Sequence, residues 1–560
     1  MENQRLLLYF TLFFIIYLLW AEWQMDYAPK PEATVAETTT PVQQEIAEVP
    51  EAAATPDETR FVESSKQQQV VSQRINVITD VLDIEIDTKG GDIRKAVLRN
   101  YAKTAENPDE KLVLMSDTEI DFFIAQSGLV SVNADTAPTH NSIYSVENNS
   151  YRLAEGVDEI KVPLQWSGAD GVRVNKIYTF RRNDYVIDLQ HVVEAGNQNW
   201  SGSQYMQLVR TPPAEDDSNA FIHTYTGGVV FNDEIKYEKV DFDDMAEQNL
   251  KATIGDGCLN ISNNQKGCEL TGGWLAMMQH YFLAAWIPES GIDNLFYSKN
   301  PSGTYKYILG ARSPALKISA EDTGSFNTRL VIGPKLQNQL KTVAPGLELT
   351  VDYGVLTIIA KPLFWLLNIF HSWFDNWGWA IIFLTITVKA VFYKLSEMSY
   401  RSMAKMRKVA PRIKQMKERY GDDRQAMSKA MMDMYKREKI NPMGGCFPIL
   451  VQMPVFIALY WVLLESVEMR YAPFILWIDN LSAKDPYFIL PIIMGVSMWI
   501  QQKLNPAPVD PVQQKIFQYM PFVFTIMFAF FPSGLVLYWV VNNILSIAQQ
   551  YVITRRIERE

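Results

Sequence analysis

Residues 377–395 read WGWAIIFLTITVKAVFYKL, a stretch whose one interior charge is Lys389. A helix that crosses a bilayer needs about 20 mainly apolar residues. The stretch has that length and composition, so it predicts a transmembrane helix and places the chain among membrane proteins.

Further apolar stretches follow it in the sequence. Residues 446–464 and 487–504 each have the length of one transmembrane helix. Residues 516–552 are too long for one crossing, because a helix rises about 1.5 Å per residue and the apolar core of a bilayer is about 30 Å thick. The sequence FPSG at 531–534 is a turn signal, so we predict two helices in a tight hairpin here and five spans in all.

A different kind of helix is predicted ahead of these spans, over residues 351–375. Its apolar run carries a polar stripe at Lys361, Asn368 and Ser372, spaced so that all three share one helical face. Such a helix typically lies in the plane of the membrane interface. We therefore predict an interfacial amphipathic helix rather than a span.

The N-terminus carries one more apolar stretch, LLLYFTLFFIIYLLW at 6–20. A cleaved signal peptide is the alternative, but cleavage needs small residues where this chain has Trp20 and Trp23. We therefore predict an uncleaved transmembrane anchor at residues 1–26. Residues 27–60 are rich in Pro, Ala, Thr and Glu and are predicted to be a flexible linker, because this composition buries too little surface to fold.

Residues 61–350 follow another periodicity. Apolar and polar residues alternate over 81–87, before a Gly-Gly turn at 90–91, and again over 172–190 on both sides of a polar turn. Alternation with period two is typical of half-buried strands. Many short strands with polar turns favour a large all-β sandwich.

Charge predicts the orientation of the chain. The whole sequence has 52 Lys and Arg against 63 Asp and Glu, a net charge of −11, which is a poor composition for a nucleic-acid-binding protein. The loop at 394–443, however, holds 14 basic and six acidic residues. Because basic loops stay in the cytoplasm, this loop and both termini are predicted to be cytoplasmic and the β domain outside. A basic cytoplasmic face suits anionic lipids and ribosomal RNA.

Motifs of catalysis are absent from the sequence. It contains no GxxxxGK[ST] loop and no HExxH, and its five histidines are scattered. Three cysteines cannot form a four-thiolate metal site. We predict no catalytic residues, no metal and no cofactor, and hence a protein that is not an enzyme.

Polar groups inside the predicted spans are sharper signals, because each is costly in hydrocarbon. Lys389 lies in the first span with Thr385 one turn before it, and Gln452 lies in the second span. The alternative for Lys389 is a side chain that extends to the nearby interface at Lys394.

The last span favours a functional interpretation. Tyr538, Asn542, Ser546 and Gln550 recur every four residues and therefore share one helical face. Hydrogen bonds between helices would explain one or two such groups. A polar ladder together with a lysine and a glutamine favours the wall of a water-filled recess.

The basic loop is predicted to form a cytoplasmic helical hairpin over 397–442. The basic loop at 394–443 carries nine methionines: Met398, Met403, Met406, Met416, Met427, Met431, Met432, Met434 and Met443. Methionine surfaces adapt to varied apolar partners, so capture of apolar segments is one interpretation. Plain packing between the two helices is the other.

Two of the three cysteines, Cys258 and Cys268, fall in the domain predicted to be outside, where disulfides persist. A disulfide that closes a short loop is one interpretation, and two free thiols are the alternative.

Longer motifs resemble a known family. NPMGGCFPILVQMPVFIALYWVL (441–463), LSAKDPYFILPIIMG (481–495) and FPSGLVLYWVVNN (531–543) closely resemble the YidC/Oxa/Alb family of membrane protein insertases. GGWLAMMQHYFLAAWIP (272–288) and SMAKMRKVAPRIKQMKERYGDD (402–423) look like its YidC branch in Gram-negative bacteria. The resemblance covers essentially the whole chain.

The resemblance implies a periplasmic β-supersandwich domain and a five-helix insertase core, here at 376–554, in the bacterial inner membrane. It implies a hydrophilic groove open to the cytoplasm and to lipid, with a charged residue, usually arginine, at the position of Lys389. Lysine keeps the charge but lacks the planar fork of arginine. The candidate groove residues, from the resemblance and the polar ladder together, are Lys389, Thr385, Gln452, Tyr538, Trp539 and Asn542.

The expected function is insertion and folding of inner-membrane proteins without nucleotide hydrolysis. The implied partners are nascent inner-membrane proteins, the Sec translocon, the ribosome and anionic lipids, with no small-molecule substrate. Relatives often carry a longer basic tail than the ITRRIERE at 553–560, which lessens the expected role of this tail in ribosome docking. A small-molecule transporter using the same polar cavity is an alternative, but it would be expected to show internal repeats. An enzyme or chaperone in the outside domain is a third class.

Overall fold

The structure is a computed structural model that describes residues 72–212, 225–246, 250, 267–301, 304–420, 423–438, 447–505 and 511–559. The predicted anchor at 1–26, the predicted linker at 27–60 and Cys258 lie outside these residues. Apart from Pro301 and Thr304, every described residue belongs to one compact unit.

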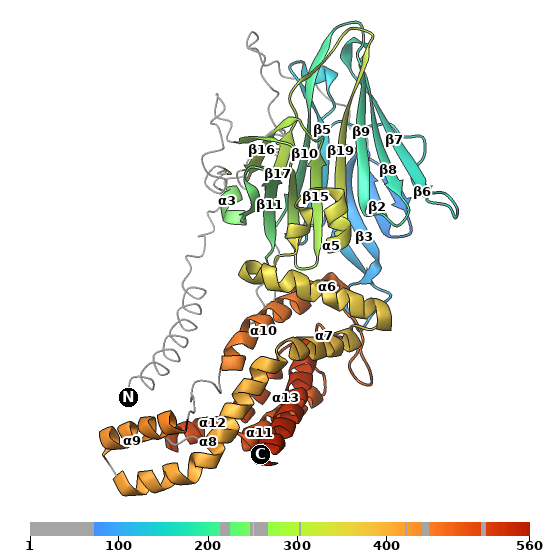
Figure 1. Ribbon diagram of the computed structural model, residues 1–560. Helices are drawn as coiled ribbons and strands as arrows, with labels where there is room; N and C mark the ends of the chain where they lie inside the picture. Colours follow the sequence, from blue (N-terminus) through green and yellow to red (C-terminus); the bar gives the residue numbers. More distant parts are fainter. Residues whose placement is uncertain are drawn as a thin grey trace. The chain divides into compact units, whose positions relative to one another are not determined.

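The first half of the described chain is a β domain of two sheets (Figure 1). The larger sheet has 11 strands in the order β13-β16-β17-β10-β5-β3-β2-β1-β6, with β18 added beside β10 and β4 beside β3. Its strands are β1 (Arg74–Ile78), β2 (Leu82–Asp87), β3 (Asp92–Ala102), β4 (Lys111–Met115), β5 (Phe123–Ser131), β6 (Ser150–Arg152), β10 (Trp200–Arg210), β13 (Cys268–Thr271), β16 (Asp293–Lys299), β17 (Tyr307–Arg312) and β18 (Leu316–Ile318).

The second sheet has eight strands in the order β12-β11-β14-β15-β19-β9-β8-β7. They are β7 (Glu159–Ser167), β8 (Arg173–Arg181), β9 (Val186–Glu194), β11 (Gly227–Asn232), β12 (Lys236–Val240), β14 (Trp274–Gln279), β15 (Phe282–Pro288) and β19 (Thr323–Pro334). Short helices accompany the sheets: η1 (Ala134–Thr136), η2 (Ala169–Gly171), α3 (Phe242–Ala246) and α5 (Gln337–Val343).

Alternation in the sequence explains this packing. In β2 the side chains of Leu82, Ile84 and Ile86 are buried between the sheets, while the residues between them are partly exposed. The hairpin predicted over 172–190 is present as β8 and β9, with Phe180 opposite Ile187. The all-β sandwich predicted from the sequence is therefore confirmed.

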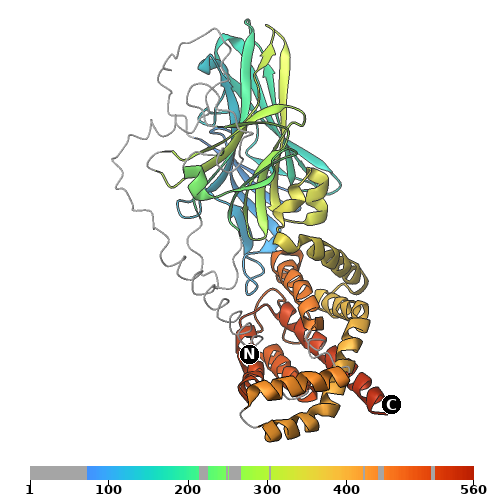
Figure 2. The same cartoon turned by 60° about the vertical axis from the view of Figure 1, so that its left-hand side comes forward.

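The second half of the described chain is helical (Figures 1 and 2). Its elements are η4 (Leu347–Thr350), η5 (Gly354–Leu356), α6 (Thr357–Phe374), α7 (Trp377–Val391), α8 (Tyr393–Tyr420), α9 (Arg424–Arg437), α10 (Phe447–Glu465), η7 (Val467–Met469), α11 (Ile489–Leu504), α12 (Pro511–Phe528) and α13 (Ser533–Arg559). The turn predicted at 531–534 falls at the break between α12 and α13, where Pro532 cannot supply a backbone N–H.

Helix α13 is central to this half, because it packs against α7, α8, α10 and α11. Helix α6 packs against α7 and α10 through Leu363, Phe364 and Leu367. The opposite side of α6 leaves Ile358 and Trp365 87% and 65% exposed.

No single helix among the described residues is both long and apolar enough to qualify as a membrane span. One bent pair, Trp377–Val391 with Tyr393–Val409, reaches the required length and apolarity together, with an angle of 66° between its parts.

Candidate functional site

Lys389 lies in the last turn of α7 and is only 8% exposed. Its ammonium donates a hydrogen bond of 2.7 Å to the hydroxyl of Ser546 on α13. Among the described residues, no carboxylate lies within ion-pair distance of it. Lys389 is therefore a buried lysine whose hydrogen-bond partner is a neutral hydroxyl.

The polar ladder of α13 continues from this bond. The Ser546 hydroxyl donates to the Asn542 carbonyl oxygen at 2.6 Å, so one serine links the lysine to the backbone of the preceding turn. Tyr538, one turn further along, is buried at 3% exposure. Tyr538, Asn542 and Ser546 therefore follow each other along one side of α13, as their spacing predicts.

Two other polar residues of α13 form hydrogen bonds to α11 and to the residue that follows it. The amide of Asn543 donates to Ser497 of α11 at 3.0 Å. The amide of Gln550 donates to the Leu504 carbonyl at 3.2 Å and to the Asn505 side chain at 3.0 Å. These two residues fit the alternative of hydrogen bonds between helices, and they fix α11 against α13.

An aromatic cluster stands at the Tyr538 end of the ladder. Phe456 of α10 lies with its ring centroid 6.1 Å from that of Tyr538 and 4.6 Å from that of Trp539. Gln452 is one turn before Phe456 on α10 and is partly exposed. Thr385 is buried on α7, where its hydroxyl donates to the Ile381 carbonyl at 2.7 Å.

The structure thus brings together two groups of candidate residues. Lys389 reaches Ser546, whose hydroxyl also bonds the backbone carbonyl of Asn542, and Phe456 packs against both Tyr538 and Trp539. Within the described part of the chain, no hydrogen bond joins Gln452 or Thr385 to Lys389. Sequence reasoning passed over Phe456, because one aromatic residue in an apolar helix carries no signal of its own.

Within the predicted hairpin, the described residues form the two helices α8 and α9. Val409, Ile413 and Tyr435 are buried between these two helices. The methionines that pack around this seam are Met406, Met416, Met431 and Met434. Met398 and Met432 remain 62% and 51% exposed, so packing explains part of the methionine pattern and leaves an apolar surface as well.

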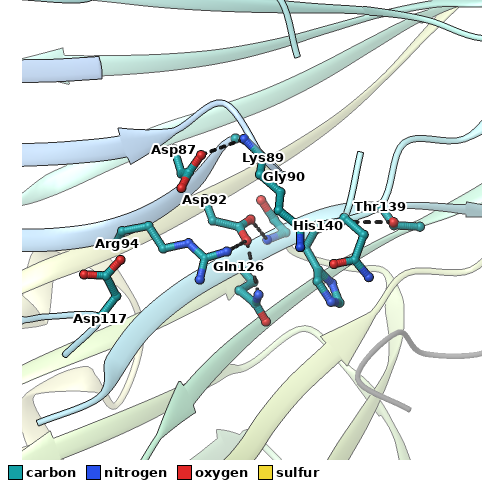
Figure 3. Close-up of polar contacts among 12 residues, drawn as sticks. Asp87, Lys89, Gly90, Asp92, Arg94, Asp117, Gln126, Thr139 and His140 are labelled. Carbon is teal, nitrogen blue, oxygen red and sulfur yellow. Dashed lines mark hydrogen bonds and ion pairs between the residues drawn. The ribbon is translucent and has the colours of Figure 1, made fainter. Parts of the chain in front are cut away.

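A buried polar cluster in the β domain is a second candidate site (Figure 3). The Asp92 carboxylate accepts hydrogen bonds from Gln126 at 3.2 Å and Arg94 at 3.3 Å. Lys176, from the other sheet, has its ammonium 3.9 Å from Asp92 and donates to the carbonyls of Gly90 and Ser127 at 2.8 and 2.9 Å. Both Asp92 and Lys176 are fully buried.

Burial governs the titration of this cluster. Desolvation raises the pKa of Asp92 to about 6, against the opposing effect of Arg94 and Lys176. Desolvation likewise lowers the pKa of Lys176 to about 8 and that of His140 to about 3. Because the cluster ties the Gly90 turn of one sheet to β8 of the other, its geometry is that of a contact between sheets.

Cys268 begins β13, is fully buried and is disulfide-bonded. Its predicted partner, Cys258, lies outside the described residues.

Comparison with known proteins covers both halves of the chain. The family model of the YidC periplasmic domain matches residues 74–366, and that of the 60Kd inner membrane protein matches residues 369–560. The membrane protein insertase YidC of Methylococcus capsulatus (strain Bath) is 50% identical, with 100% of this chain and 99% of that protein covered. The membrane protein insertase YidC of Thioalkalivibrio sulfidiphilus is 48% identical, with the same coverage. Among solved structures, an active YidC insertase with its first transmembrane domain resolved matches 88% of this chain and 93% of its own at 18% identity and a TM-score of 0.39.

The β-sandwich domain and the helical body that follows it each match a family model, and together they define a two-part inner membrane protein. The chain belongs to the YidC family of membrane protein insertases. Its function is membrane protein insertion and its location is a membrane. The prediction that it is not an enzyme is confirmed by this family, and the transporter alternative finds no support in it.

Proposed function

We propose that insertion proceeds along the side of α13 that carries Tyr538, Asn542 and Ser546, opposite Lys389. The observation that carries the proposal is the buried Lys389 ammonium, which has a single hydroxyl partner and no ion pair within the described residues. A buried charge held only by a neutral group is poorly compensated, so an acidic or polar flank of a substrate would improve its environment.

The driving force of this mechanism is the transfer of the apolar substrate segment from water to lipid. The polar face lowers the cost of carrying the polar flank partway across. The exposed apolar side chains of α12, among them Phe522 and Ile526 at 62% and 67%, offer the apolar segment a surface toward lipid. No nucleotide enters the scheme.

Site-specific photocrosslinking tests this route. A photoreactive residue at 385, 452 or 538 of the full chain should form adducts with a stalled single-span nascent chain. A matched probe at Ile526 serves as the lipid-facing control. Adducts from Ile526 with none from the other three positions would overturn the groove.

We further propose a topology of one anchor and five spans, with both termini cytoplasmic and the β domain in the periplasm. Two exposed side chains on opposite predicted sides allow a test, namely Ile120 of the β domain at 78% and Met398 of α8 at 62%. In a chain whose native cysteines are replaced, an impermeant maleimide added from the periplasmic side should label Ile120→Cys and leave Met398→Cys unlabelled. The reverse pattern would contradict the topology.

The basic α8–α9 hairpin is proposed to meet ribosomes and anionic lipids. Lys405, Arg407 and Lys408 are exposed on α8. Their joint replacement by glutamine should weaken ribosome binding and flatten its dependence on salt, because each phosphate contact contributes to that slope. The Sec translocon is the remaining proposed partner, and it should copurify with the full chain.

A disulfide between Cys258 and Cys268 is proposed for the β domain. Protein taken from the periplasmic face without reductant should yield a peptide that joins the two cysteines, and free-thiol labelling of both would contradict the pairing.

A further inference from the structure

The segment that follows α10 enters the core of the β domain. Val467, in η7, is 2% exposed and packs in the same hydrophobic cluster as Trp286 and Phe296 of the two sheets. A residue of the helical half thus completes the core of the β half.

A buried ion pair stands at the start of this segment. Lys335 follows β19 directly, and Glu465 is the last residue of α10. The Lys335 ammonium lies 3.6 Å from the Glu465 carboxylate, and the two side chains are 2% and 8% exposed. Lys335 also donates to the Thr350 carbonyl at 3.2 Å. Removing one partner of such a pair leaves a buried charge uncompensated, so the loss of either side chain would weaken the contact between the two elements.

Neighbouring residues also bind this end of α10. The last carbonyls of a helix lack partners within the helix. Here the His280 ring nitrogen Nε2 donates to the Leu464 carbonyl at 2.9 Å, since a carbonyl oxygen can only accept. Beyond the helix, the Arg470 guanidinium donates to the Ala102 carbonyl at 2.8 Å. The β domain therefore supplies a cap for α10 and a second attachment for the segment after it.

The other part of α10 reaches the candidate groove. Phe456 contacts Tyr538 and Trp539, and it lies nine residues before Glu465, roughly 13 Å along a helix. Pro454 inside α10 removes one backbone hydrogen bond of the helix. The direction of the helix after Pro454 therefore depends on what holds its far end.

We propose that the Lys335–Glu465 ion pair is a positioning contact that anchors the outer end of α10 to the β domain and so holds Phe456 against Tyr538 and Trp539. The proposal rests on the proposed groove, and it makes Lys335 and Glu465 positioning residues for insertion. It also gives the β domain a part in insertion through α10.

Hydrogen exchange of the full chain in lipid tests the anchor without any substrate. Lys335→Met or Glu465→Gln should speed exchange of the amides of α10 about tenfold, because each leaves a buried group unpaired. The charge-reversed pair Lys335→Glu with Glu465→Lys should restore most of the protection. Arg173→Met, which breaks an exposed ion pair with Glu194, is the matched control and should leave α10 unchanged.

Insertion and crosslinking complete the test. At equal amounts of folded protein, each single variant should lower the insertion yield of a single-span substrate. It should also lower the yield of adducts between that substrate and a probe at 452. The charge-reversed pair should restore both yields. Unchanged exchange in α10, or insertion that stays low after charge reversal restores the exchange, would overturn the positioning role. If the unsubstituted chain gives no adduct at 452, that result would contradict the proposed groove but not the anchoring of α10, because hydrogen exchange is measured without a substrate.

Discussion

The ammonium of Lys389 and the hydroxyl of Ser546, 157 positions apart in the sequence, are joined by a 2.7 Å hydrogen bond between α7 and α13. This bond is what connects the predicted lysine of the first span to the predicted polar ladder of the last. Lys389 is the cation in this contact, and Ser546 is its hydrogen-bond acceptor. Substitutions at the two positions can therefore test the charge and the hydrogen bond separately.

Removing the charge should discriminate between substrates. Lys389→Ala is expected to impair insertion of substrates with acidic translocated tails more than insertion of neutral ones, because attraction of negative charge is lost. Lys389→Arg keeps the charge and should retain most activity. Parallel insertion assays on an acidic and a neutral tail provide the measurement. Equal impairment of both tails would show a structural lysine.

Removing the hydrogen bond should have a smaller effect. Ser546→Ala removes the hydroxyl to which the Lys389 ammonium donates, and hydrogen bonds to charged groups contribute about 1.5–3 kcal/mol. We expect a lower unfolding temperature and a partial loss of insertion that does not depend on tail charge. Asn543→Ala, which removes a bond to Ser497 on another side of α13, is the control for general weakening of the helix. A loss that depends on tail charge as strongly as in Lys389→Ala would contradict this separation.

Local patterns allowed much of this architecture to be predicted. The β8–β9 hairpin follows from alternation within one stretch, and the break between α12 and α13 follows from a proline in a turn. The same alternation places Lys176 between Val174 and Tyr178 on the buried face of β8, so a buried lysine in the β domain was open to prediction. It was missed because charge was weighed only inside the predicted spans.

Contacts between distant parts of the chain could not be predicted in this way. The strand order of the larger sheet depends on pairings such as Gly202 with Ser131, which no local period encodes. Ser546 was in the predicted ladder, but nothing in its spacing distinguished it from Asn542 as the partner of Lys389. The Lys335–Glu465 pair likewise joins two charges that each look ordinary in sequence.

The turn before β3 should be sensitive to one added methyl group. Gly90 has φ +77°, and a Cβ there would lie 2.5 Å from the His140 carbonyl oxygen. Gly156 also has φ +77°, but beyond its two neighbours in the chain no atom of the described residues lies within 4 Å of its Cβ position. Gly90→Ala should therefore cost more than the strain of about 1–2 kcal/mol that both alanines share. Urea unfolding of the β domain within the full chain, followed by pulse proteolysis, measures both variants. Equal losses would show that the turn moves freely.

The buried Asp92 should give the β domain a distinctive dependence on pH. Its pKa is raised from 3.8 to about 6 by burial, so the folded state binds a proton more readily than the unfolded state between those values. The stability that Asp92 contributes is therefore present below about pH 4 and is lost as pH rises through about 6, by roughly 2–3 kcal/mol. Asp92→Asn cannot titrate at this position, and Lys176 keeps its bonds to the Gly90 and Ser127 carbonyls in that variant.

Pulse proteolysis from pH 4 to 7.5 measures the unfolding free energy of the natural chain and of Asp92→Asn. As pH rises, the natural chain should lose stability relative to Asp92→Asn. Asp188→Asn, at an exposed ion pair with Arg181, provides the control for general charge effects. A difference that is constant over this range would mean that Asp92 is ionised in the folded state as readily as in the unfolded one. A difference that moves in favour of the natural chain with rising pH would mean that it is ionised more readily in the folded state, and either result would contradict the prediction.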